Sequence, residues 1–392
     1  MSDPSHLFAR RMTQMRPSTI REILKVTAQP EVISFAGGLP APELFPVAEV
    51  KAAAESALTR YGSQALQYGP SEGMPLLREW VAAEMNRRGV MAVPADVLMT
   101  NGSQQVLDLA GKLYLNAGDV VLTENPTYLA AIQAFQTFEA KFVPVPTDEN
   151  GLIPETVPEL IRVHRPKFLY TIPNFQNPTG ITLSAARRQA LARIAAEHEL
   201  VILEDDPYGK LRYRGTDIPP VRHWDEAGQV LYASTFSKTI APGLRLGWVV
   251  APPAIFSRLL ILKQASDLHT SSFDQLVAYC YLTQNDQAAH LGRIRRAYGE
   301  RYEVLDGALR AAMPPGFTWT KPEGGMFLWV TGPERLDAME LLQRAVAHKV
   351  AFVPGRDFFP GDAGRNFLRL NYSNSTPERI REGVQRLAGL CR

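Results

Sequence analysis

The alternation of short apolar runs with helix-like segments between residues 97 and 265 constrains the fold more than any other feature of the sequence. Seven runs have the character of strands: 97–100, 120–124, 141–145, 167–172, 200–205, 229–234 and 245–251. Helices are predicted at 103–115, 128–138, 155–164, 184–198 and 253–265. Continuous apolar strands that alternate with helices indicate a mostly parallel sheet covered on both faces. We therefore predict an α/β fold built on a seven-stranded sheet between helices.

The length of the chain favours more than one domain, because 392 residues exceed what one simple core usually holds. Two further helices are predicted before the alternation, at 47–59 and 75–88. After about residue 285 a long charged helix (287–312) precedes a mixture of strands and helices. We predict an N-terminal arm and loop (1–45) that packs with the small domain, a large domain (46–285) and a smaller α+β domain (286–392).

The composition excludes several classes of protein. The 42 basic and 40 acidic residues nearly balance, so nucleic acid and membrane surfaces are not expected partners. Cys280 and Cys391 are the only cysteines, which argues against a disulfide framework and a zinc site and favours a reducing cytoplasm. The N-terminus lacks the apolar core of a signal peptide, and no run approaches the roughly 18 apolar residues of a membrane helix.

The loops that follow the strands carry the chemical information, because the carboxyl ends of parallel strands usually hold the active site. Ser103 and Gln104 open a helix directly after a strand, where free N–H groups and the helix dipole favour an anion. Simple N-capping by Ser103 is the alternative. Tyr128 lies just past the next strand and either stacks on a planar ligand or packs in the core.

Two more loops add polar groups. Asn177 precedes Pro178 in a turn after the strand at 167–172. The strand at 200–205 ends in three carboxylates, and Tyr208 follows Asp205 by three positions. Carboxylates at a strand end can hold a metal, but a metal needs further ligands and no histidine lies near in sequence. A single buried aspartate can instead face the protonated nitrogen of a ring, and this interaction needs no further ligands. We therefore expect no metal at this site.

A lysine between two apolar strands is the most unusual feature, since burying an ammonium group is costly. Lys238 lies among hydroxyls that include Thr235 and Ser237, with Arg245 seven residues on. An arginine and hydroxyl donors suit a phosphate dianion, and a lysine beside such a site can form an imine with a carbonyl ligand. Together with the preceding loops, these groups describe one ligand, pyridoxal 5′-phosphate.

In this order and spacing, the motifs resemble the class I/II aminotransferases of fold type I, particularly the 2-aminoadipate and kynurenine subgroup. The resemblance covers nearly the whole chain and implies an aspartate-aminotransferase-like fold. The motifs are STIRE, SFAGGLPAPELFP, YGPSEG, NGSQQ, NPTG, DDPY, STFSK, PGLRLGW, GGMFLW and FLRLNYS. Thr235 departs from the serine of many relatives but keeps the hydroxyl.

The resemblance implies roles for single residues. Lys238 matches the Schiff-base lysine, Asp205 the partner of the pyridine nitrogen, and Tyr208 and Asn177 the partners of the ring oxygen. Tyr68 matches a tyrosine that reaches the phosphate of the neighbouring subunit, because the family is homodimeric.

The same resemblance implies the substrate contacts and the reaction. Arg369 matches the arginine that binds the substrate α-carboxylate, with Asn177 beside it, and Arg21 matches a mobile residue that reads the side chain. The loop at Gly38 leaves room for backbone approach. Ping-pong transamination is expected, with glutamate and 2-oxoglutarate as one pair and a 2-aminoadipate, aromatic or branched amino acid in the other.

Two alternatives remain open. A β-lyase or decarboxylase on the same fold would break a different bond at Cα and release ammonia or carbon dioxide. A non-catalytic sensor domain would carry a DNA-binding domain ahead of it, and we expect the roughly 30 residues before the family-like core to be too few for one.

Overall fold

A seven-stranded sheet forms the centre of the computed structural model, which describes residues 4–13, 15, 23, 29, 31–361 and 363–391. Its strands lie in the order β2-β10-β9-β8-β7-β3-β4. Their bounds are β2 (Val97–Thr100), β3 (Val120–Thr123), β4 (Lys141–Pro144), β7 (Phe168–Thr171), β8 (Val201–Asp205), β9 (Val230–Thr235) and β10 (Gly247–Val250). Only β10 runs antiparallel to its neighbours, so the predicted mostly parallel sheet is confirmed.

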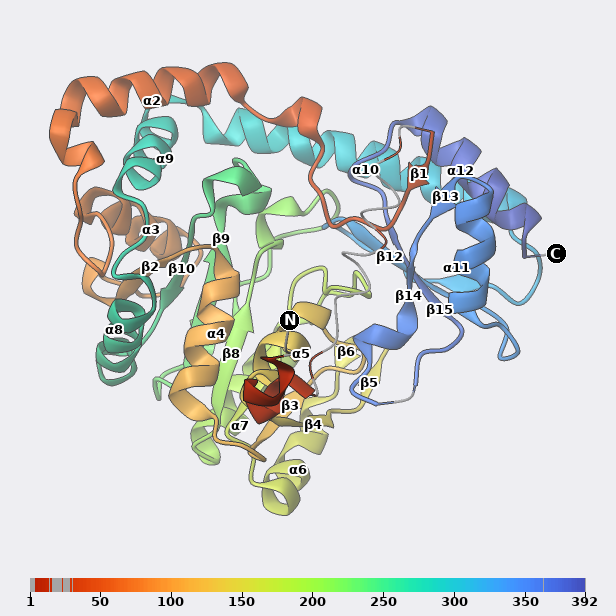
Figure 1. Ribbon diagram of the computed structural model, residues 1–392, viewed down its shortest axis with the longest axis horizontal. Coiled ribbons are helices and arrows are strands. Elements are labelled where there is room, and N and C mark those ends of the chain that lie inside the picture. Colours follow the sequence, from red (N-terminus) through yellow and green to blue (C-terminus); the bar gives the residue numbers. More distant parts are fainter. Residues whose placement is uncertain are drawn as a thin grey trace.

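Helices cover both faces of this sheet (Figure 1). On β8, Leu203 joins the hydrophobic cluster that contains α4 (Ser103–Tyr114) and α5 (Leu129–Gln136), whereas its neighbour Ile202 joins the cluster that contains α7 (Ala185–Glu197). This burial on both sides explains why the strands are continuously apolar. The helices of this half are α2 (Val47–Tyr61), α3 (Pro75–Arg87), α4 (Ser103–Tyr114), α5 (Leu129–Gln136), α6 (Val157–His164), α7 (Ala185–Glu197), α8 (Pro253–Asp267) and α9 (Ser272–Gln284).

The helix α9 was not predicted from the sequence. Its buried residues include the consecutive runs Leu276–Ala278 and Cys280–Leu282, so most of its circumference is covered. A helix buried on most sides lacks the amphipathic period by which helices are recognised in a sequence.

A second, four-stranded antiparallel sheet lies beside the first, in the order β11-β12-β15-β14. Its strands are β11 (Thr318–Trp319), β12 (Phe327–Thr331), β14 (Val353–Pro354) and β15 (Phe367–Asn371), with the helices α10 (Gln287–Ala312), α11 (Ala338–Ala347) and α12 (Pro377–Gly389). In Figure 1, α10 runs along the top from the large sheet to the small one. Near the N-terminus, β1 (Ile33–Ser34) pairs in parallel with β13 (Val350–Ala351), and a hairpin joins β5 (Thr147–Asp148) to β6 (Gly151–Leu152).

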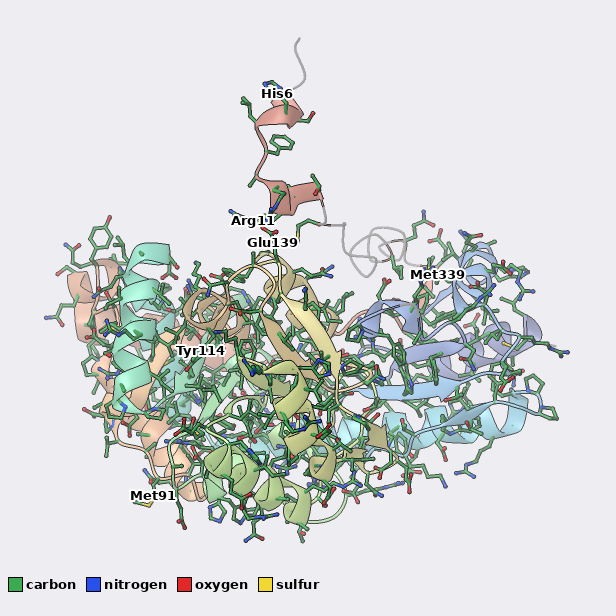
Figure 2. All side chains as sticks on the ribbon, turned by 90° about the horizontal axis from the view of Figure 1, so that it is seen from below. His6, Arg11, Met91, Tyr114, Glu139 and Met339 are labelled. Carbon is green, nitrogen blue, oxygen red and sulfur yellow. The ribbon has the colours of Figure 1, made fainter. Side chains whose placement is uncertain are left out.

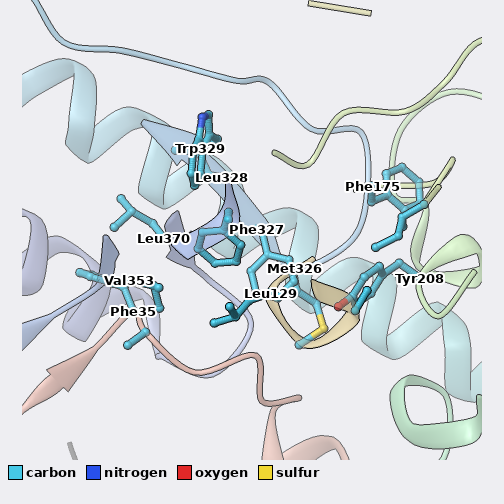
Figure 3. Packing of buried hydrophobic residues seen from close by; sticks show 14 of the residues in the cluster. Phe35, Leu129, Phe175, Tyr208, Met326, Phe327, Leu328, Trp329, Val353 and Leu370 are labelled. Atoms are coloured by element: carbon cyan, nitrogen blue, oxygen red, sulfur yellow. The ribbon is translucent and has the colours of Figure 1, made fainter. Parts of the chain in front are cut away.

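One hydrophobic cluster connects the two sheets. Figure 3 shows it extending from Phe35 and Val353 through Phe327 to Tyr208. The rings of Tyr208 and Phe327 meet edge to face, with centroids 5.8 Å apart. The loop after β8 and the strand β12 therefore lie against each other, and the space near them is lined by both halves.

Two short 3₁₀ helices, η1 (Pro4–Leu7) and η2 (Arg10–Thr13), project from the body of the molecule (Figure 2). Arg10 Nη2 donates a hydrogen bond to Glu139 Oε2 at 2.7 Å. Arg21, a predicted substrate residue, lies outside the described residues. Within the described part of the chain, no helix has both the length and the apolar character needed to cross a membrane.

Candidate active site

A cavity of about 580 Å³ opens at the carboxyl ends of the large sheet, within the size range of small-molecule sites. Twelve of the fourteen residues predicted for the site line it: Gly38, Ser103, Gln104, Tyr128, Asn177, Asp205, Tyr208, Thr235, Ser237, Lys238, Arg245 and Arg369. Tyr68 does not. Its side chain is 79% exposed and meets the ring of His269 edge to face.

One side of the cavity is suited to an anion. Gly102, with φ 72°, ends the turn after β2, and α4 begins at Ser103. The first N–H groups of a helix have no acceptor within it and carry its positive dipole end. The Arg245 guanidinium lies against this turn, and a Cβ on Gly102 would stand 2.8 Å from Arg245 Nη2. Glycine at 102 therefore allows the backbone and the guanidinium to face the same anion.

Hydroxyl groups at the end of β9 continue this anion-binding surface. Thr235 caps the short helix η9 (Phe236–Lys238) by accepting a hydrogen bond from the Ser237 N–H at 3.1 Å. The Thr235 hydroxyl lies 2.9 Å from the Ser237 hydroxyl and 2.8 Å from the Leu246 carbonyl. These contacts hold both hydroxyls at the edge of the cavity.

The Lys238 amine lies inside the cavity rather than in solvent. Its Nζ donates a hydrogen bond to the Gly38 carbonyl at 2.9 Å. Burial, together with the charges of Arg245 and Arg369, lowers the pKa of Lys238 to about 8. A much larger fraction of this amine is therefore neutral, and so nucleophilic, at neutral pH than for an exposed lysine.

The three carboxylates that end β8 have three different surroundings. Glu204 accepts the backbone N–H groups of Val221 and Arg222, at 2.8 and 2.9 Å. Asp206 forms an ion pair with Arg88 at 2.8 Å. Asp205 alone of the three lines the cavity. Among the described residues, no group of three or more His, Cys, Asp or Glu side chains could hold a metal ion.

Asp205 has one satisfied and one unsatisfied oxygen. Its Oδ2 accepts a hydrogen bond from the Tyr170 hydroxyl at 2.9 Å. Its Oδ1 is buried with no hydrogen-bond partner among the described residues. Burial raises the pKa of this carboxyl to about 7. A buried carboxylate with a free oxygen is suited to a cationic N–H donor.

Arg369 on β15 reaches the other side of the cavity. Its Nη1 donates to Asn177 Oδ1 at 2.9 Å, and its Nη2 donates to the Ala36 carbonyl at 2.6 Å. Within the described part of the chain, no carboxylate is among the groups that shift its pKa, and its Nε has no partner. Burial lowers the pKa of Arg369 to about 10. A buried guanidinium without a counter-charge is suited to a carboxylate ligand.

Asn177 links Arg369 to Tyr208. The Asn177 Nδ2 donates to the Tyr208 hydroxyl at 3.4 Å, while Asn177 Oδ1 accepts from Arg369. The Arg369 guanidinium also stacks on the ring of Phe327, 4.4 Å from its centroid. This connected set ties the loop after β8 to the second sheet.

Phe327 and Tyr170 are among the residues of this site that sequence reasoning missed. Phe327 lines the cavity and lies within GGMFLW, one of the motifs of the family resemblance, but no residue of that motif was predicted for the site. Tyr170 binds Asp205 from the neighbouring strand β7. A signal for Tyr170 was present, because the hydroxyl of a tyrosine in a buried strand normally needs a polar partner.

The fold and the cavity together define a class of enzyme that binds a phosphorylated aldehyde cofactor. The sequence model of the family described as "Aminotransferase class I and II" matches residues 31–387, and the chain belongs to this family. It is therefore a transaminase, and its cofactor is pyridoxal 5′-phosphate.

Individual relatives are similar over nearly their full length. Aromatic-amino-acid aminotransferase 1 of Thermococcus litoralis is 43% identical over 98% of this chain and 94% of its own length. The Pyrococcus horikoshii kynurenine aminotransferase, solved "in complex with PMP, KYN as substrates and KYA as products", is 40% identical with a TM-score of 0.95, over 99% and 98% of the two chains. The α-aminoadipate aminotransferase of Thermus thermophilus, complexed with N-(5′-phosphopyridoxyl)-L-leucine, is 40% identical with a TM-score of 0.93, over 100% and 98%.

The residues present fit this cofactor on structural grounds. Asp205 Oδ1 is a buried acceptor without a partner among the described residues, as a protonated ring nitrogen requires. Close approach is possible at Gly247 on β10, where a Cβ would stand 2.7 Å from the Ser103 N atom. The turn at α4, Arg245 and the hydroxyls at the end of β9 together form the kind of site that a phosphate dianion needs.

Proposed function

We propose that this transaminase moves the amino group of an L-amino acid to a 2-oxo acid in two half-reactions that use the same cavity, a ping-pong scheme. Glutamate and 2-oxoglutarate form one pair. A 2-aminoadipate, aromatic or branched amino acid belongs to the other. The observation that carries the proposal is the meeting of Lys238, Asp205 and Arg369 in one cavity.

The proposed cofactor site uses groups from several strand ends. When bound, pyridoxal phosphate supplies an aldehyde for imine linkage to Lys238 or the substrate amine, and a ring that withdraws electrons from the substrate Cα. The phosphate would be held by Ser103, Gln104, Thr235, Ser237 and Arg245. The ring would be held by Tyr128 and Asp205, and the ring oxygen by Asn177 and Tyr208.

In the proposed mechanism, Asp205 holds a proton on the ring nitrogen through its free Oδ1. The Lys238 amine, released when substrate binds, would remove the proton from the substrate Cα as a general base and would deliver it to the C4′ carbon of the cofactor as a general acid. Its low pKa supports both roles near neutral pH. Tyr208 would stabilise negative charge on the ring oxygen by donating a hydrogen bond from its hydroxyl.

The proposed substrate contacts follow from charge. Arg369 and Asn177 would bind the α-carboxylate, since the Arg369 Nε is buried without a partner among the described residues. The Gly38 loop would pass over the substrate, and Arg21 would read an acidic side chain. The named substrates of the relatives, aromatic amino acids, kynurenine and α-aminoadipate, support a roomy side-chain site.

We further propose a homodimer in which Tyr68 of each subunit reaches the phosphate of the other. The exposure of Tyr68 outside its own cavity supports this arrangement. The proposed division is an arm and loop (1–45), a large domain (46–285) and a small domain (286–392), which the two separate sheets support. Cys280 and Cys391 are both free thiols, which supports a reducing cytoplasm as the place of work.

Absorbance spectra of the purified protein test the function. We expect a visible cofactor band that moves to the near-ultraviolet with L-glutamate and returns with a 2-oxo acid. Lys238→Ala should lose this exchange and slow turnover by about a thousandfold or more, whereas the surface variant Lys51→Ala should behave as wild type. Release of ammonia or carbon dioxide instead of a 2-oxo acid would contradict transamination.

A further inference from the structure

A buried ion pair lies behind the turn that opens α4, outside the groups used in the mechanism. Lys263 on α8 is 0% exposed, and its partner Asp267 keeps 23% of its side chain exposed. The Lys263 Nζ donates to Asp267 Oδ1 at 2.8 Å and to Oδ2 at 2.9 Å. Taking such charges out of water costs about as much free energy as their attraction returns. The presence of this ion pair is therefore weak evidence that it stabilises the fold, and its contacts indicate another role.

The pair holds two side chains of the turn. Asp267 Oδ2 accepts hydrogen bonds from Asn101 Nδ2 at 2.6 Å and from Gln105 Nε2 at 2.8 Å. Gln105 Oε1 accepts from Lys263 Nζ at 3.1 Å and from the backbone N–H of Asn101 at 2.9 Å. Both the side chain and the backbone of Asn101 are therefore fastened to α8, directly or through Gln105.

The remaining backbone groups of the turn also have partners. The Asn101 carbonyl accepts from Arg245 Nη2 at 3.5 Å. The N–H and the carbonyl of Gly102 bind the carbonyl and the hydroxyl of Thr100, at 2.9 and 3.0 Å. The next two N–H groups belong to the first turn of α4, which has no acceptor within the helix. The orientation of these two donors depends on the turn that the ion pair holds.

We propose that Lys263 and Asp267 are positioning residues for the phosphate of the cofactor, because they fix the turn whose N–H groups bind it. The inference rests on the proposed function, in which Ser103 and Gln104 hold the phosphate. Neither Lys263 nor Asp267 lines the cavity. They act through Asn101 and Gln105, so their effect is confined to ligands that carry a phosphate.

The full-length protein, freed of cofactor, is titrated with pyridoxal phosphate and with pyridoxal, which lacks the phosphate, and visible absorbance is followed. Asp267→Asn removes the charge that orients Asn101 and Gln105. We expect it to weaken binding of pyridoxal phosphate about tenfold and to leave pyridoxal binding unchanged. A residue that only supports the fold would change both affinities together.

A second variant is needed if Asp267→Asn does not fold because it leaves the ammonium group of Lys263 unpaired in the interior. Lys263→Met/Asp267→Leu removes both charges, a replacement that buried ion pairs often tolerate, and should give the same phosphate-specific loss. Lys112→Met is the matched control. It removes another contact between α4 and α8, from Lys112 Nζ to Ser266 Oγ at 2.8 Å, and should change neither affinity.

Two results would overturn the proposal: equal weakening of both ligands, or unchanged binding of pyridoxal phosphate, in the double variant. Failure of the wild-type protein to bind pyridoxal phosphate at all would instead overturn the proposed function. The two failures are therefore distinguishable.

Discussion

The surroundings of Lys238 give its amine a chemistry that differs from that of an ordinary exposed lysine. Burial and the charges of Arg245 and Arg369 bring its pKa down to about 8 from 10.5. The same two guanidinium groups are those that we propose for the phosphate and the substrate carboxylate. In this proposal, one pair of cations attracts the anionic groups of the ligands and also lowers the pKa of the amine that reacts with them.

The rate at which cofactor-free protein captures pyridoxal phosphate should follow the neutral form of this amine. That fraction rises about tenfold per pH unit below the pKa and levels off above it. We expect the rate to rise with pH and to level off near pH 8. Stopped-flow absorbance measures it, with Nα-acetyl-lysine in solution as the control whose rate keeps rising to about pH 10. A protein rate that rises as far as the control would contradict the low pKa.

Among the elements, β10 and the start of α4 lie in very close contact at the site. A Cβ on Gly247 would stand 2.6 Å from the Gly102 carbonyl carbon and 2.7 Å from the Ser103 N atom. Both are backbone atoms that cannot rotate away. Only glycine at 247 therefore lets the strand pass so close to the turn that we propose to hold the phosphate.

Replacing this glycine should separate strand and helix. We expect Gly247→Ala to lower the free energy of unfolding by about 2 kcal/mol and to weaken binding of pyridoxal phosphate. Gly307→Ala is the matched control. It lies in α10 with no atom within 4 Å of an added Cβ, so it should raise stability by about 1 kcal/mol. Urea unfolding of the cofactor-free proteins measures both. An unchanged free energy of unfolding for Gly247→Ala would contradict this expectation, because the turn would then move aside at little cost.

At the scale of the whole molecule, the site combines distant parts of the chain. Lys238 comes from the end of β9 in the large sheet, whereas Arg369 comes from β15 in the small one. Tyr68 lies outside the cavity, exposed beside His269. In the proposed homodimer, a second copy of the chain supplies this tyrosine and completes the site.

Mixed dimers test this arrangement. A dimer of one Lys238→Ala subunit and one Tyr68→Ala subunit contains one intact site if the tyrosine crosses between subunits, because both defects then fall in the other site. We expect about half of the wild-type activity per dimer, which coexpression with two affinity tags and steady-state assays would measure. If Tyr68 served its own subunit, each site would carry one defect, and activity would not exceed that of the Tyr68→Ala homodimer.

Much of the fold was readable from the sequence alone. Apolar strands that alternate with helices predicted the sheet, since local periodicity reports which faces are buried. The motifs around Lys238, Asp205 and Arg245 predicted the cofactor because each chemical group of the cofactor needs a particular partner at a strand end. The cavity then gathered twelve of the fourteen predicted residues, with Tyr68 outside it and Arg21 outside the described part of the chain.

Only the tertiary structure decided which polar groups meet. Three adjacent carboxylates were alike in the sequence, and packing alone gave Asp205 the cavity and Asp206 the ion pair with Arg88. Tyr170, which binds Asp205, lies 35 residues from it in the sequence, and Phe327, which packs on Tyr208, lies 119 residues from that tyrosine. Local pattern records how much of a residue is buried, but pairing across the fold depends on how strands and helices pack, which no local pattern contains.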